Sequence, residues 1–283
     1  IAIGYTMVYG IVELINFAHG DLFMLGAFLA LTLVGALGLE HAGPAGVAAG
    51  LALVFLVTML FCGIVNLLND RIVYKPLRNA PRLTPLVSAI GLSFLFMGIG
   101  QVWKGVADLN FPDLVPNTHL LGGDALRFTA KDLLVVLVTV PLMAGLTVFV
   151  KTTRLGKAMR ATAQNPTAAR LMGIDVDRVI GATFAIGGVL AGAASVVYAL
   201  SINTVSYQMG FQNGLYAFTA AVLGGIGSLP GAMLGGLVIG LVRSLGSQYV
   251  GEQWTSALVF AILILILVFR PSGLFGSPGR EKV

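Results

Sequence analysis

The sequence predicts an all-α, polytopic membrane protein with about eight to nine transmembrane or re-entrant helices. Hydrophobic residues make up 57% of the 283 residues, and charged residues make up only 10%. A soluble domain carries roughly 25% charged residues, so this chain could not cover a surface that faces water. Its apolar stretches also approach the ~20 residues that cross the hydrocarbon core as a helix.

The expected membrane segments follow from the positions of these apolar stretches. The region 216–249 is too long for one helix and is interrupted by Gly and Pro between Gly224 and Gly231. The stretch 1–12 is short, and we expect it to be the remainder of a truncated first span. Polar stretches of ~30 residues are too short to fold alone, so we expect 1–283 to form a single transmembrane domain with loops. The other expected spans are 22–39, 45–68, 83–102, 133–150, 179–200 and 256–269.

Basic residues gather in three places, which sets the expected orientation. Of the 17 Lys and Arg residues, four lie in the connection 71–82, six in 151–178 and three in the tail after 269. Alternating spans place all three on one side, which the positive-inside rule assigns to the cytoplasm. The opposite connections are neutral or acidic; 104–132 contains Asp108, Asp113, Asp124 and Asp132 against Lys104, Arg127 and Lys131.

Glycine pairs four residues apart recur within the spans. Such small residues let helices approach closely in a bilayer, so we expect close packing between helices there, more than dimerisation through any one pair. The pairs are Gly46/Gly50, Gly188/Gly192, Gly231/Gly235 and Gly236/Gly240.

The basic segment 151–178 contains a short helix with its own start and stop signals. Asn165-Pro166 is typical of an N-cap followed by proline at the first helical position. Gly173 can adopt the left-handed conformation that ends a helix. Small and apolar residues between these signals, from Ala168 and Ala169 to Met172, would stay outside the membrane. An exposed surface of this kind favours a docking role over a plain connecting loop.

This segment resembles the coupling loop of bacterial ABC importer permeases, which docks on an ATP-binding subunit. The run Thr167-Ala168-Ala169-Arg170-Leu171-Met172-Gly173 is similar to the family's Glu-Ala-Ala-x-x-x-Gly loop, with Thr167 in place of Glu. More specific likenesses cover nearly the whole chain and point to the branched-chain amino-acid permeases, closest to the high-affinity Liv type. They are Gly4 to Gly10, Ile15 to Asp21, Gln164-Asn165-Pro166 with Met172-Gly173-Ile174, and Gly224 to Gly231.

The resemblance implies a complex in the bacterial inner membrane. A second, related permease chain would complete the pathway, two ATP-binding subunits would drive it, and a periplasmic binding protein would deliver leucine, isoleucine or valine. Residues 165–173 would form the ATPase-coupling helix. Urea and short-amide permeases are similar, so they stay as alternative substrates.

The segment Asn16 to Asp21 is a candidate part of the substrate pathway. Asn16, His19, Gly20 and Asp21 lie between apolar runs and suggest a helix break that lines a cavity. Asp21 could meet the ammonium of an amino acid, and backbone N–H groups after Gly20 its carboxylate. An interfacial loop that caps a helix beginning at Leu22 explains the same residues.

The glycine–proline element is the other candidate part of the pathway. Gly224, Gly225 and Gly227 would belong either to a turn between half-length helices or to a hairpin between ordinary spans. We favour a structural break there over direct contact with substrate.

Other classes of function find little support in the residues. The sequence lacks a complete phosphate loop, so ATP–Mg would bind partner subunits and this chain would hold no cofactor. His19, His41 and His119 are scattered and predict no metal site, and no catalytic pair suggests an enzyme. Nucleic acid is not an expected partner. A stand-alone secondary transporter or channel is the other class of protein to consider, with Glu13 and Asp21 as its few membrane acids.

Overall fold

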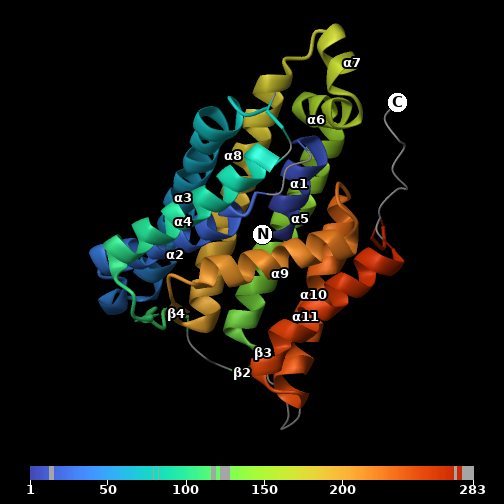
Figure 1. The fold of residues 1–283 in the computed structure, drawn as a ribbon. Helices are drawn as coiled ribbons and strands as arrows, with labels where there is room; N and C mark the ends of the chain where they lie inside the picture. The colour runs from blue at the N-terminus through green and yellow to red at the C-terminus, as the bar shows by residue number, and fades with distance from the viewer. Residues whose placement is uncertain are drawn as a thin grey trace.

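The computed structural model describes residues 1–12, 16–78, 80–81, 83–115, 119–121, 128–270 and 273–275. Helices dominate these residues, as the composition predicts (Figure 1). The longer helices are α1 (Ala2–Val12), α2 (Ala18–Ala36), α3 (Pro44–Asn69), α4 (Leu83–Lys104), α5 (Ala130–Thr152), α6 (Arg154–Gln164), α8 (Val176–Ile202), α9 (Met209–Gly224), α10 (Leu229–Tyr249) and α11 (Glu252–Phe269). The short elements are η1 (Leu39–His41), η2 (Asp70–Tyr74), α7 (Pro166–Leu171), β1 (Leu109–Asn110), β2 (His119–Leu121), β3 (Phe128–Thr129) and β4 (Thr204–Val205).

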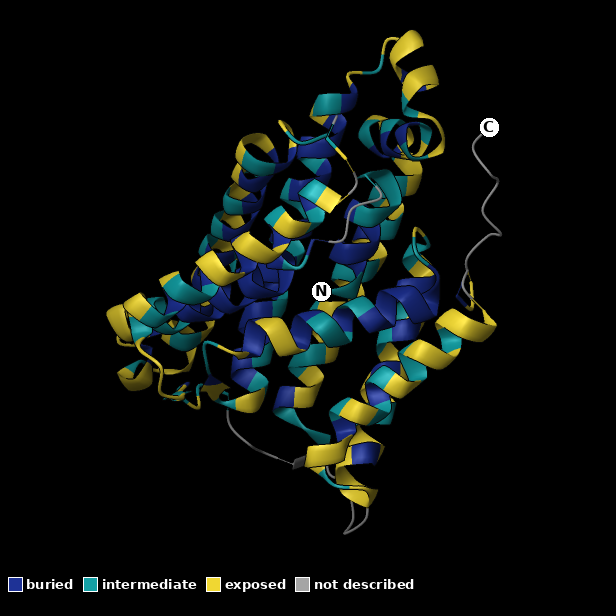
Figure 2. Ribbon diagram, in the orientation of Figure 1, coloured by how far each residue is buried: buried dark blue, intermediate teal, exposed yellow. Residues whose placement is uncertain are grey.

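Seven of the described helices are long and apolar enough to cross a membrane. They are α2, α3 continued by η2, α4, α5, α8, α10 and α11, while α1 and α9 are shorter. Helices such as α5 and α11 leave apolar side chains exposed along their outer faces (Figure 2). Lipid is the solvent that fits such faces. The all-α, polytopic class is therefore confirmed.

The centre of the molecule is built on α2 and α8, the most buried of the seven spans. Helix α2 packs against α3, α4, α8 and α9, and α8 lies along α3. Glycine permits the α3–α8 contact, because a Cβ added at Gly188 or Gly192 would meet the backbone of Cys62 or Thr58. For Gly231 and Gly235 an added Cβ would likewise meet the backbone of α9, whereas at Gly236 and Gly240 it would meet no atom of the described residues within 4 Å, so the expected close packing is absent there.

Contacts at the two ends of the bundle agree with the expected alternation of spans. At one end Asp177, at the start of α8, pairs with Lys75 and Arg78, which joins two of the three basic segments. At the other end β1 pairs with β4, so the connection after α4 lies beside the one after α8. Some charged residues that define the expected sides of the connections and of the C-terminal tail lie outside the described residues. They are Arg82, Asp124, Arg127, Arg280 and Lys282.

The interruption near residue 225 is a tight turn between two helices. Helix α9 ends at Gly224 and α10 begins at Leu229. Gly225 and Gly227 have φ of 98° and 88°, a backbone region that favours glycine. Ser228 caps α10 by accepting from the Gly231 amide at 3.2 Å. The predicted structural break is confirmed, and α9 crosses the molecule between α2 and α10 (Figure 1).

Candidate functional site

Helix α7 is the short capped helix that the sequence predicts. The Asn165 side chain accepts a hydrogen bond from the Ala168 amide at 3.0 Å, and Pro166 occupies the first turn. Gly173 follows with φ of 81°, in the left-handed region. The helix protrudes beyond α6 at the end of the molecule that carries the basic segments (Figure 1).

One side of α7 is open and the other packs on the chain itself. Leu171 and Met172 are 83% and 82% exposed. Ala169 is only 4% exposed and belongs to the hydrophobic core, so the expectation that it forms part of the exposed surface is wrong. The reason is the turn at Gly173, which lets Ile174 donate to the Ala169 carbonyl and folds the chain back over that residue. The open surface consists of Thr167, Ala168, Arg170, Leu171 and Met172.

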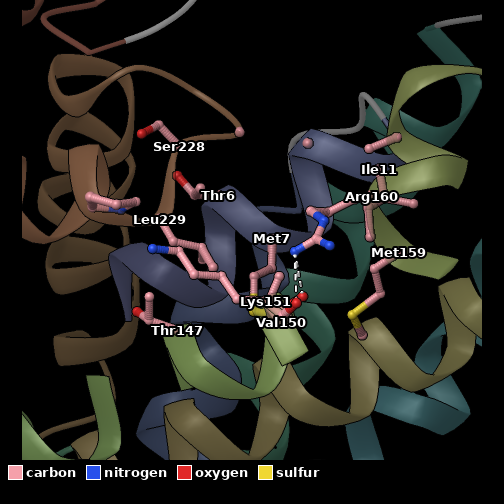
Figure 3. Close-up of a pocket in the computed structure, with 14 residues that line it drawn as sticks. Thr6, Met7, Ile11, Thr147, Val150, Lys151, Met159, Arg160, Ser228 and Leu229 are labelled. Carbon is pink, nitrogen blue, oxygen red and sulfur yellow. Dashed lines mark hydrogen bonds between the residues drawn. The ribbon is translucent and has the colours of Figure 1, made fainter. Parts of the chain in front are cut away.

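Helix α6 contacts both α7 and the end of α5. Arg160 donates to the carbonyl oxygens of Val150 and Lys151, at 2.9 and 3.3 Å, which fixes α6 against the end of α5 (Figure 3). Thr153 caps α6 by accepting from the Gly156 amide. Displacement of α6 and α7 would therefore strain the end of α5.

A cavity of about 290 Å³ lies beside α6, between α1, α5 and the α9–α10 turn. Its walls are mostly apolar, and its polar members are Thr6, Thr147, Lys151, Arg160 and Ser228 (Figure 3). Gly227 also lines it, and the turn at Gly227 contacts α1 at Gly10. Neither His19 nor Asp21 reaches this cavity, so the two predicted parts of the pathway occupy different places.

The segment Asn16 to Asp21 is buried, and most of it is helical. Asn16, His19 and Asp21 are between 0 and 2% exposed. Helix α2 begins at Ala18 rather than Leu22, so these side chains do not form a wetted loop or cap a helix that starts later. Backbone N–H groups after Gly20 lie inside α2, which corrects their expected role as free donors. Packing against α1, α4 and α9 overrides the local polarity of the segment.

Four neighbouring elements supply the contacts of this buried polar cluster. Ser93 of α4 donates to one carboxylate oxygen of Asp21. The Tyr5 ring of α1 lies edge-on to His19, with centroids 4.9 Å apart. The Tyr74 hydroxyl of η2 donates to Asn16 Oδ1 at 2.7 Å. On the side of α9, a Cβ added at Gly20 would meet the backbone of Gly210 and Gly214.

Several polar atoms of the cluster have no hydrogen-bond partner among the described residues. They are both ring nitrogens of His19, Oδ1 of Asp21, Nδ2 of Asn16, and Oδ1 of Asn66 on α3. Buried polar groups without partners are costly, especially within a bilayer. Ionisable groups in membrane helices are by default functional-site candidates. This cluster is therefore the best-supported candidate for polar contact with a solute inside the membrane.

Sequence reasoning missed the residues that surround Asn16 and Asp21. Ser93, Tyr74 and Tyr5 each lie in or beside an apolar run and carry no charge. The sequence therefore gives little indication that they contact a polar cluster. Polar side chains within long apolar stretches are the one signal that could have found them. Glu13, the other acid considered for coupling to an ion gradient, lies outside the described residues. Where the structure describes the chain, no group of three potential metal ligands occurs.

The fold and these sites define a class of protein, a multi-pass membrane permease. Seven of the described helices are long and apolar enough to cross the bilayer, polar groups gather within the bundle, and a short helix with exposed apolar side chains is presented at the basic end. Comparison with known proteins is more specific. Residues 1–268 match the family described as "branched-chain amino acid transport system / permease component", and the chain belongs to that family. It is therefore the permease of a multi-component transport system, not an enzyme.

Curated relatives match over the full length of the chain. The high-affinity branched-chain amino acid transport system permease protein BraD of Pseudomonas aeruginosa is 41% identical over 289 residues, covering 100% of this chain and 92% of the relative. LivH of Escherichia coli K12, of the same description, is 39% identical with the same coverage. A probable LivH of Methanocaldococcus jannaschii is 27% identical over 99% of this chain and 89% of the relative. No solved structure matches the chain.

Proposed function

We propose that this chain is a membrane-spanning subunit of an ATP-driven importer that carries leucine, isoleucine and valine across the bacterial inner membrane. The observation that carries the proposal is the full-length likeness to BraD and LivH, at 41% and 39% identity. Their printed descriptions name high-affinity transport of branched-chain amino acids. The same likeness favours a transport-system subunit over a stand-alone secondary transporter.

Helix α7 is the proposed docking element for an ATP-binding subunit. Its open surface combines Ala168, Leu171 and Met172, which a partner cleft could cover. Two ATP-binding subunits would hold ATP–Mg, a second related permease would form the other half of the pathway, and a periplasmic protein would deliver the solute. ATP binding would move α7 and α6, and the spans would alternate between inward and outward access.

The buried cluster at the start of α2 is the proposed polar contact of the pathway. The carboxylate of Asp21 has one oxygen without a partner among the described residues, and it complements the ammonium group of an amino acid. Apolar helices around it suit a branched aliphatic side chain. The Gly224–Gly231 turn, at the cytoplasmic end, would support the rearrangement of α9 and α10 without touching the solute.

Uptake into proteoliposomes tests this proposal. The chain is purified with its accompanying subunits, ATP is enclosed on the side of α7, and labelled leucine, isoleucine, valine and urea are offered with the binding protein. We expect ATP-dependent uptake of the three amino acids and none of urea. Uptake of urea alone would change the substrate but keep the class. Uptake driven by an ion gradient without ATP would reject the importer.

A further inference from the structure

The guanidinium of Arg78 bridges two elements that are far apart in the sequence. Nη1 lies 2.6 Å from Oδ1 of Asp177, at the start of α8. Nη2 lies 2.6 Å from Oδ1 of Asp70, at the start of η2. One planar side chain thus ties the segment that immediately follows α7 to the segment that ends α3. Lys75 adds a second contact to Asp177 at 3.1 Å.

Burial makes the Asp70–Arg78 half of this bridge rigid. The Asp70 side chain is 2% exposed and that of Arg78 is 13% exposed, whereas that of Asp177 is 41% exposed. Loss of one partner would leave a buried charge uncompensated, which is much costlier than loss of a surface ion pair. Charge-assisted bonds to a guanidinium are also directional, because its donors lie in one plane. Displacement of Asp177 would therefore pull on Arg78, which its buried pair with Asp70 holds in place.

Segment η2 carries the connection onward to α2. It is a π-helical turn in which the Lys75 amide donates to the Asp70 carbonyl at 2.7 Å, and such turns are frequent at functional sites. Its last residue, Tyr74, is buried, packs against Phe184 and donates to Asn16 Oδ1. The Asn16 carbonyl in turn accepts from the His19 amide at 3.1 Å, at the beginning of α2.

We propose that Arg78 is a positioning residue that transmits movement of α7 to the buried polar cluster, through Asp177, Asp70, Tyr74 and Asn16. The role of α7 rests on the proposed function, but the mechanical connection does not. The links Asp177–Arg78, Arg78–Asp70 and Tyr74–Asn16 are ion pairs or hydrogen bonds between buried or partly buried groups, and the π-helical backbone of η2 joins Asp70 to Tyr74. The route runs from the exposed helix at the basic end to the first turn of α2. Displacement of α7 would then shift Asn16 and the helix that carries Asp21.

Amide hydrogen exchange of the full chain in lipid nanodiscs tests the connection without any substrate. Asp177→Asn removes the charge that Arg78 binds, and Tyr74→Phe removes only a hydroxyl. Arg178→Gln is the matched control, because its ion pair with Asp175, three residues away, joins no other element. We expect Asp177→Asn to speed exchange of the amides at 17–21 by at least about threefold, as a local opening does. Tyr74→Phe should do the same there while leaving 166–178 unchanged.

The double variant separates transmission from general loss of structure. If the two residues act in one route, Asp177→Asn with Tyr74→Phe should speed exchange at 17–21 no more than the stronger single variant. Faster exchange throughout α2, α3 and α8 would show a merely structural role and overturn the proposal. So would an Asp177→Asn effect confined to the neighbourhood of residue 177.

Uptake by the assembled transporter gives the functional readout. Asp177→Asn should lower uptake per ATP hydrolysed by about tenfold, the effect of ~1.4 kcal/mol of lost coupling, with ATP hydrolysis and subunit assembly retained. Arg178→Gln should match wild type. Equal losses of hydrolysis and uptake would contradict transmission. Failure of wild type to take up any amino acid would reject the proposed function, while the exchange measurements would still decide the connection.

Discussion

At the scale of single residues, Asp21 is energetically costly to bury and has a specific hydrogen-bond partner. Its carboxylate lies within a membrane helix, fully buried, and accepts one hydrogen bond from Ser93. Ionisable groups buried among membrane helices are rare and usually have a partner, so packing alone does not account for it. The proposed contact with the ammonium group of the solute would do so.

Replacement of Asp21 tests that contact. Asp21→Asn keeps the size of the side chain and removes its charge, and we expect uptake of leucine to fall about tenfold or more. The reason is loss of a charge-assisted hydrogen bond, worth ~1.5–3 kcal/mol. Ser93→Ala is the control, since it removes the neighbour but keeps the carboxylate, and its effect should be smaller. Wild-type uptake by a normally expressed Asp21→Asn protein would remove Asp21 from the pathway.

At the scale of helices, the sequence predicts most of what local rules govern. Apolar runs locate the spans, and the Asn165-Pro166 and Gly173 signals locate α7 because capping acts within a few residues. The start of α2 could not be found in this way, since Asn16 to Asp21 is polar and its residues from Ala18 onward become helical through tertiary packing. The burial of Ala169 and the Arg78 bridge depend on the same long-range contacts.

The open surface of α7 supports a prediction at this scale. Ala168→Trp adds bulk where a partner would bind, and we expect uptake to fall at least about tenfold while the chain itself remains folded, because Ala168 is exposed. The measurement compares uptake with ATP hydrolysis in the assembled complex. Ala45→Trp, at an exposed position in the first turn of α3, should have no such effect.

A substitution at the buried Ala169 tests the folding of α7, whereas one at the exposed Ala168 tests its docking. Its side chain is buried against this chain, so Ala169→Trp should overpack the core and reduce the yield of folded protein, typically by 1–3 kcal/mol of stability. A folded, normally expressed Ala169→Trp chain would contradict this arrangement of α7. Normal coupling in Ala168→Trp would instead contradict the docking assignment.

At the scale of the whole molecule, charge and contacts agree on one orientation. Ion pairs join the connections that contain Lys75 and Asp177, and both belong to the basic end that the positive-inside rule assigns to the cytoplasm. The pairing of β1 with β4 belongs to the opposite end. An ATP-binding partner is cytoplasmic, so the proposed function requires α7 to face that side. An orientation with the basic end outside the cell would be incompatible with the proposed function.

Cysteine labelling in spheroplasts measures the orientation directly. The chain has one cysteine, Cys62, which is buried in α3, so Cys62→Ala gives a cysteine-free background at small cost. Lys157→Cys on α6 and Glu40→Cys in η1 then place single thiols at exposed positions on opposite ends. We expect a membrane-impermeant maleimide to label the Glu40 variant in intact spheroplasts and the Lys157 variant only after permeabilisation. The reverse pattern would put α7 outside the cell, where no ATP-binding subunit could drive it, and labelling of both from one side would contradict the arrangement of spans.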